Sequence, residues 1–151
     1  MMIGVISDTH GLLRPQAIEV LRGCELILHA GDVGEEAVLD ELRRIARVVA
    51  VRGNVDVEPW ARRLPATEMI EAGAKTFYIL HRRADLELKP GAAGVDAVIF
   101  GHSHRPAIEF CDGVLFLNPG SAGPRRFRLP VTLGRIEVKG GELRPEIIPL
   151  L

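Results

Sequence analysis

Short apolar runs alternate with amphipathic segments in the first third of the chain. The runs 2–7, 24–32 and 47–54 are rich in aliphatic residues and end in polar residues, a pattern typical of buried strands. Between them, residues 14–23 and 35–46 place their apolar side chains at helical spacing. This alternation predicts a parallel sheet with right-handed helical crossovers.

From residue 67 onward the pattern changes to short strands and turns. Segments 67–73 and 75–81 predict a hairpin, and residues 96–102 predict another buried strand. The segment 84–94 could hold a short helix broken by Pro90 and Gly91. Glycine-rich turns separate four further strand candidates: 107–113, 114–120, 131–138 and 142–150. We therefore expect an α/β front half and a β-rich back half, built as two packed sheets with helices outside.

Composition and charge narrow the class of protein. With 47% apolar and 26% charged residues, the chain is expected to form one globular domain over residues 1–151. The formal net charge of −1 gives no case for nucleic acid or an anionic membrane, although a local basic patch would escape that test. No signal peptide or membrane span is expected. Cys24 and Cys111 lack metal or redox spacing, which predicts two buried thiols and a cytoplasmic protein.

Polar residues with metal-binding chemistry follow five of the predicted strands. Each alone has a plain structural explanation, such as helix capping for Asp8 or a turn for Asn54. In an open α/β sheet, however, ligands bind beyond the carboxyl ends of the strands, so these side chains are expected at one edge. The set comprises Asp8, His10, Asp32, Asn54, His81, His102 and His104.

Two carboxylates, one amide and four imidazoles suit a pair of transition-metal ions. On extended chain, residues i and i+2 point the same way, so Asp8 and His10 can serve one ion. The same spacing lets His102 and His104 reach adjacent ions. One carboxylate can bridge ions about 3.5–4 Å apart, the arrangement used for in-line phosphoryl displacement. Two divalent ions and two carboxylates leave a charge of about +2, which attracts phosphate.

The ordered blocks D-T-H, G-D, G-N, H and G-H-S-H resemble the calcineurin-like metallophosphoesterase superfamily, and most closely its small prokaryotic YfcE-like phosphodiesterase branch. The likeness covers essentially the whole chain, including "LNPGSAGPRR" at residues 117–126. It implies a four-layer α/β/β/α sandwich of two mixed sheets flanked by helices, without a cap domain. By this resemblance Asp8, His10 and His104 would hold the first metal, Asn54, His81 and His102 the second, and Asp32 would bridge them.

The same resemblance implies a metal-dependent phosphodiesterase in which a metal-bridging hydroxide attacks a small phosphate ester. Manganese is the first metal to expect, and nickel, cobalt, iron and zinc fit the same donors. Homodimers or higher homo-oligomers occur in the family. Two alternatives remain open: a non-catalytic protein-binding scaffold of the same fold, as in the retromer subunit, and a phosphomonoesterase or nucleotide pyrophosphatase with the same metals.

The sequence departs from the family pattern at two positions. Many members carry a histidine after G-N, often assigned as the general acid, whereas this chain has Val55. Asp56 lies one residue further on and is not assumed to replace it. We therefore expect diesters or activated esters to be preferred over alkyl monoesters. Arg82 stands where a glycine usually follows His81, and could narrow the site or contact phosphate.

Other polar and aromatic residues near these motifs have less direct roles. His29 lies inside a predicted strand and is expected to be buried or to support a ligand. Asn118 is expected to fasten a turn, and Trp60 to anchor a loop. Arg125 and Arg126 could bind substrate phosphate, or form a solvated basic loop.

Overall fold

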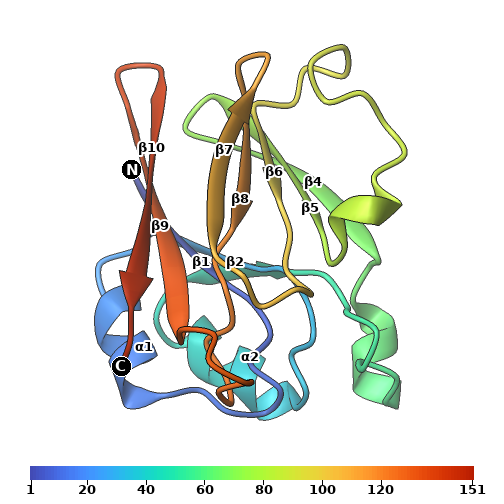
Figure 1. The fold of residues 1–151 in the computed structure, drawn as a ribbon, viewed down its shortest axis with the longest axis vertical. Helices are drawn as coiled ribbons and strands as arrows, with labels where there is room; N and C mark the ends of the chain where they lie inside the picture. The colour runs from blue at the N-terminus through green and yellow to red at the C-terminus, as the bar shows by residue number, and fades with distance from the viewer.

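The computed structural model describes residues 1–151, which form two five-stranded mixed sheets (Figure 1). In the first sheet the strand order is β10-β9-β1-β2-β3, and β1, β2 and β3 are parallel. Its strands are β1 (Met2–Ile6), β2 (Leu26–His29), β3 (Arg47–Ala50), β9 (Thr132–Lys139) and β10 (Glu142–Pro149).

The second sheet has the order β4-β5-β6-β8-β7. Strands β5, β6 and β8 are parallel, while β4 and β7 pair antiparallel at the two edges. Its strands are β4 (Thr67–Ala72), β5 (Lys75–Leu80), β6 (Ala97–Ile99), β7 (Ala107–Cys111) and β8 (Val114–Asn118). All predicted strands are present, and the expected two-sheet α/β sandwich without a cap domain is confirmed.

The division into a front and a back half is only partly correct. The C-terminal hairpin β9–β10 returns to the first sheet, where β9 pairs antiparallel with β1 in the register Val5↔Gly134. Local periodicity identifies a strand but not its partner, because pairing depends on contacts far apart in the chain. As a result, the start of β9 lies beside the end of β1, close to the loop that carries Asp8.

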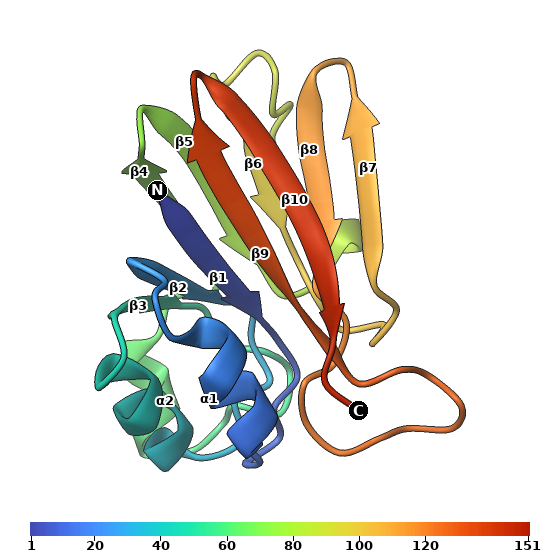
Figure 2. The same cartoon turned by 90° about the vertical axis from the view of Figure 1, so that its left-hand side faces the viewer.

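Alternation along the strands separates three hydrophobic layers. Ile3 and Val5 point between the sheets, where they pack with Phe77, Ile79 and their neighbours. Ile6 points to the opposite face of the first sheet. Helices α1 (Pro15–Leu21) and α2 (Glu36–Arg43) cover that face, as Figure 2 shows.

The outer face of the second sheet is covered without an α-helix. By its sequence the segment 84–94 could hold a short helix, but only the 3₁₀ helix η2 (Arg83–Asp85) forms, at its start. Pro90 and the glycines beside it prevent a longer helix. Leu86 and Leu88 still pack against the buried cluster on this face, so the fourth layer is thin and irregular.

Two further details complete the fold. Trp60 lies in η1 (Pro59–Arg63), which the sequence did not predict, and packs against the helix-side core, as expected for a loop anchor. Both cysteines are free; Cys24 is buried, but Cys111 is only partly buried, so the expectation of two buried thiols is half wrong. The two α-helices have seven and eight residues, and no helix is long and apolar enough to cross a membrane.

Candidate metal centre

Six of the seven predicted ligands lie together beyond the ends of four parallel strands. The first sheet supplies three of them from the loops after β1 and β2, and the second sheet supplies three from the ends of β5 and β6. Backbone hydrogen bonds continue between the first two loops: Asp8 N–H donates to Gly31 O (3.0 Å), and His10 N–H to Asp32 O (3.0 Å). The loops are therefore held in register with the sheet.

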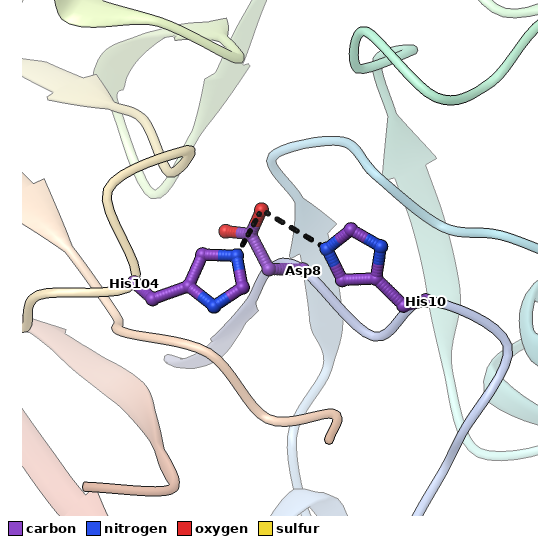
Figure 3. Close-up of side chains that lie close together, drawn as sticks. All are labelled: Asp8, His10 and His104. Atoms are coloured by element: carbon purple, nitrogen blue, oxygen red, sulfur yellow. Dashed lines mark ion pairs between the residues drawn. The ribbon is translucent and has the colours of Figure 1, made fainter. Parts of the chain in front are cut away.

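Asp8, His10 and His104 form the first of two groups of side chains. One ligand atom from each lies within 4.8 Å of the others. Asp8 Oδ1 is 3.4 Å from His104 Nε2 and 3.9 Å from His10 Nε2, and Figure 3 shows both imidazoles turned toward this oxygen. This spacing suits a cation between the three groups.

Asp32, His81 and His102 form the second group, with the same limit of 4.8 Å between ligand atoms. Asp32 Oδ2 lies 3.2 Å from His81 Nε2, and His81 Nε2 lies 3.3 Å from His102 Nδ1. Asp32 Oδ2 is also 3.6 Å from His10 Nε2 of the first group. The two groups are thus adjacent, and a single carboxylate oxygen faces both.

The backbone at these residues is unusual. Five of the six lie in the left-handed region, with φ of 56° at Asp8, 45° at His10, 55° at Asp32, 72° at His102 and 63° at His104. Non-glycine residues adopt this conformation uncommonly, and it costs on the order of 1–3 kcal/mol each. Extended backbone was expected at Asp8–His10 and His102–His104, and this expectation is wrong. Tight left-handed turns bring these pairs to the site instead.

Asn54 lies in the loop after β3 and is exposed. Its neighbours both touch Asp32: Val55 N–H donates to Asp32 Oδ1 (3.1 Å), and Gly53 packs so closely on Asp32 that a Cβ would collide with the carboxylate. Gly53 therefore allows two loops of the protein to approach.

His81 is 6% exposed and has a fixed orientation. Its Nδ1 is 2.8 Å from Ala30 O, so Nδ1 carries the hydrogen and Nε2 faces the carboxylates. Metal-binding histidines are commonly oriented by such a carbonyl. The next residue is Arg82, whose Nε lies 3.8 Å from Asp85 Oδ2.

The charges of the second group are strongly coupled. Burial raises the pKa of Asp32, but hydrogen bonds from His81 and Val55 N–H and the charges of His81 and His10 outweigh it and lower the pKa to about 2. Burial lowers the pKa of His81, but hydrogen bonds to Asp32 and Ala30 O, with the charges of Asp32 and Asp8, outweigh it and raise the pKa. A proton on His81 Nε2 and a cation would compete for the same position.

His102 lies at the exposed edge of the site. Partial burial of its ring lowers its pKa, and the charges of His81 and Arg82 lower this pKa further. A lowered pKa keeps this imidazole neutral, which is the form that binds metals. His102 and Asn54 are the exposed members of the set, so they mark the open side of the site.

The structure gives Asp56 a supporting role that the sequence did not predict. Asp56 is 4% exposed and accepts hydrogen bonds from Val33 N–H (3.1 Å), Gly34 N–H (3.0 Å) and Gly53 N–H (2.8 Å). It fastens the loops after β2 and β3 to each other and faces backbone, so it does not take the place of the missing histidine. The sequence shows that Asp56 lies two residues after Asn54, but it does not show which way the Asp56 side chain points.

The buried polar residues predicted to play supporting roles do so. His29 is fully buried, as expected, and bonds Thr9 Oγ1 (3.0 Å) and Gly31 N–H (3.1 Å). Asn118 accepts from Gly120 N–H (2.9 Å), which fastens the predicted turn, and also donates to Gly101 O (3.1 Å) beside the histidine loop.

The donor set fits divalent cations. Asp8 Oδ2 accepts from Ser7 Oγ (2.8 Å) and His102 N–H (3.1 Å), whereas buried Asp8 Oδ1 has no hydrogen-bond partner. His10 Nε2 is likewise buried without one. Buried polar atoms are almost always satisfied, so these two facing atoms are best explained by a cation between them.

The model of the calcineurin-like phosphoesterase superfamily domain matches residues 1–141, and the chain belongs to this family. A probable metallophosphoesterase from Methanocaldococcus jannaschii is 37% identical, over 99% of this chain and 82% of that protein. The protein is therefore a metallophosphoesterase-family member that carries candidate metal ligands.

Solved structures agree with this assignment. An archaeal phosphodiesterase superposes with a TM-score of 0.81 at 29% identity, covering 98% of this chain and 100% of the other. Vps29 from Entamoeba histolytica, solved in complex with Zn²⁺, has a TM-score of 0.75 at 25% identity and covers the full length of both chains.

Proposed function

We propose that this protein is a metal-dependent phosphodiesterase working with two divalent ions. Asp8, His10 and His104 would hold one ion, and Asn54, His81 and His102 the other, with Asp32 shared between them. The observation that carries the proposal is the pair of unpartnered buried atoms, Asp8 Oδ1 and His10 Nε2, facing one another beside a second donor group of Asp32, His81 and His102.

The chain's own residues would set the chemistry in four ways. Asp32 Oδ1 accepts from Val55 N–H, which leaves Oδ2 to face both donor groups, so Asp32 would be shared by the two ions. The Ala30 carbonyl fixes the His81 ring. The buried side chains close the back of the site, while His102 and Asn54 leave the front open to an ester. When bound, the ions would supply Lewis-acid polarisation of phosphoryl oxygens and a water acidic enough to attack near neutral pH.

The proposed preference for diesters rests on the absence of a residue that could protonate the leaving group. In the reaction, the water oxygen bonds to phosphorus as one ester P–O bond breaks, giving a phosphomonoester and an alcohol. Val55 provides no proton for the departing alkoxide, and buried Asp56 accepts three backbone N–H groups. Activated esters, whose leaving groups depart without a proton, and diesters are therefore the substrates proposed. We place this activity in the cytoplasm, where free Cys24 and Cys111 stay reduced.

A protein-binding scaffold is the second candidate, because Vps29 shares the fold. The completeness of the donor set favours an enzyme, since each of the seven positions carries a residue able to bind a metal. No part of this set would be needed by a scaffold that used another surface.

The test is hydrolysis of a chromogenic phosphate diester and its matching monoester by metal-stripped protein, with Mn²⁺, Ni²⁺, Co²⁺, Zn²⁺ or Mg²⁺ added singly. We expect metal-dependent turnover that favours the diester, with Mn²⁺ the first ion to try. Faster turnover of the monoester than of the diester would contradict the proposed preference for diesters. Binding of metal without turnover of either ester would favour the scaffold.

Two variants test the assigned ligands. Asn54→Ala and His104→Ala should each reduce kcat by about a hundredfold or more, because an incompletely held ion is mispositioned. Asn54 is exposed, so its variant should unfold at the wild-type temperature when both proteins are metal-free. Glu87→Ala, an exposed residue without an ion pair, is the matched control. Wild-type rates in either ligand variant would refute its assignment.

A further inference from the structure

A basic loop borders the candidate metal centre. Residues 119–131 connect β8 to β9 and contain Arg125, Arg126 and Arg128 without any acidic residue. Arg105 lines the same open hollow as Phe127, Arg128 and Leu129. We call Arg105 and residues 123–130 the basic loop surface; Figure 2 shows the connection as the wide loop between β8 and β9.

The arginines of this surface are not used by the fold. Arg105, Arg125, Arg126 and Arg128 are all exposed, and none takes part in an ion pair, whereas six other arginines of the chain do. Arg125 donates only to the carbonyl of Leu129 in its own loop (3.3 Å). Four unneutralised positive charges therefore gather locally in a chain whose net charge is −1.

Phe127 lies among these arginines with an exposed side chain and a strained backbone. It is 89% exposed, the most exposed large apolar side chain of the protein. Its backbone is left-handed, with φ of 55°. A bulky residue in this region is a genuine outlier, and such strain is commonly retained where it serves binding. Neither the exposure nor the backbone angle stabilises the fold.

Two segments of the surface begin next to predicted ligands. Arg105 directly follows His104. The start of the loop packs against Asp8: Ser121 Oγ donates to Asp8 O (3.0 Å), and Gly123 lies against the same carbonyl. Arg14 holds the loop from the other side by donating to Gly123 O (3.2 Å). The basic loop surface therefore begins beside two of the predicted ligands, Asp8 and His104.

We propose that the basic loop surface binds single-stranded nucleic acid and presents its phosphodiester backbone to the metal centre. One base would stack on the exposed ring of Phe127, and the flanking phosphates would pair with the surrounding arginines. Aromatic stacking and cationic contacts to phosphate are how single strands are bound without sequence preference. The inference rests on the proposed function, because it names the class of diester that this site would take.

The first test is binding of a short fluorescein-labelled oligothymidylate to the metal-loaded protein, followed by fluorescence anisotropy. Phe127→Ala should weaken binding about tenfold or more, the usual effect of removing one stacked base, while Phe127→Trp should retain it. Arg126→Ala should lower the slope of log affinity against log salt by about 0.7, the value for one contact to a single-strand phosphate. Arg44→Ala removes an exposed, unpaired arginine at the end of α2 and should leave binding unchanged.

The second test separates this inference from the proposed function. It compares kcat/KM for the p-nitrophenyl ester of thymidine 5′-phosphate with that for methyl p-nitrophenyl phosphate. The ratio should exceed one in the wild type and fall about tenfold in Phe127→Ala. Turnover of both esters with no effect of Phe127→Ala on the ratio or on oligonucleotide binding would overturn the inference alone. Phe127-dependent binding without turnover of either ester would refute the phosphodiesterase and leave a nucleic-acid-binding surface.

Discussion

At the scale of single residues, His29 shows how a buried polar group is tied to one protonation state. Its Nδ1 accepts from Gly31 N–H, so its Nε2 carries the hydrogen and donates to Thr9 Oγ1, which in turn donates to Val33 O (2.8 Å). Burial, with a smaller contribution from His81, lowers the pKa of His29 to about 4 against the opposing charges of Asp56, Asp8 and Asp32. The ring is held neutral between the two loops of the first sheet.

This lowered pKa predicts a loss of stability in mild acid. The unfolded chain protonates His29 as the pH falls through about 6.5, whereas the folded protein resists until about 4. The contribution of His29 is therefore fully present above pH 6.5 and is lost as the pH falls toward 4, by about 3 kcal/mol in total. Urea unfolding in the presence of a chelator should show this slope between pH 6.5 and 4. The non-titrating His29→Gln should show a flatter one, and equal slopes would contradict the prediction.

Asp56 is the residue whose role the structure changed most. Asp56→Ala would leave three backbone N–H groups without their acceptor, and we expect it to lower the free energy of unfolding by about 2–4 kcal/mol. Neighbouring Glu58 is exposed and makes no capping hydrogen bond, so Glu58→Ala should change it by less than about 0.5 kcal/mol. Urea unfolding measures both. Equal stability of the two variants would show that Asp56 is not the fastening residue.

At the scale of elements, the candidate centre depends on how closely the loop after β6 approaches the loop after β1. Gly101 lies against Ser7 Oγ and the Asp8 carboxylate, and a Cβ at this position would collide with both. His102 N–H donates to Asp8 Oδ2 (3.1 Å) from the same turn. The contact therefore sets the position of the two histidines that follow relative to the first carboxylate.

Gly101→Ala should push these loops apart. We expect metal affinity to fall at least tenfold and the unfolding temperature to drop by several degrees, because the buried side chains of Ser7 and Asp8 must move to relieve the contact. Gly91→Ala is the control, since a Cβ there meets nothing within 4 Å and the residue does not have a left-handed φ. Calorimetric metal titration and thermal unfolding measure the two effects. Wild-type metal affinity in Gly101→Ala would contradict this account of the loop contact.

At the scale of the whole molecule, the candidate centre lies across the junction of the two sheets. Asp8, His10 and Asp32 come from the first sheet, and His81, His102 and His104 from the second. Ions held between them would link the two sheets and would bind the folded state alone, because the unfolded chain separates the two groups. Metal binding should therefore contribute directly to stability.

We expect a saturating metal to raise the unfolding temperature. A metal at a hundred times its Kd contributes about 2.7 kcal/mol, and a chain of about this length shifts by roughly 2–4 °C per kcal/mol, so the rise should be about 5–10 °C. Asp32→Ala should abolish most of it, whereas Glu87→Ala should keep it. Differential scanning calorimetry with and without metal provides the measurement. An unchanged temperature in the wild type would show that no metal is held between the sheets.

The sequence predicted the strands and the ligand set better than the geometry that joins them. Alternation and turn residues placed each strand, because these are local properties. They did not reveal that β9 returns to pair with β1, or that Pro90 and its glycines leave only a 3₁₀ turn in the fourth layer. The extended-chain argument at Asp8 and His10 also failed, because loop dihedrals depend on the hydrogen bonds between neighbouring loops.

By itself the sequence determined which donor chemistry is available, in what order, and at the end of which strand, because residue type and hydrophobic period are written along the chain. Only the tertiary structure decided how these donors divide into two groups and which carboxylate oxygen faces both. It also decided that Asp56 turns to backbone while Phe127 turns to solvent. These are distances and directions between segments far apart in sequence, and they are fixed by the packing of two sheets rather than by any local pattern.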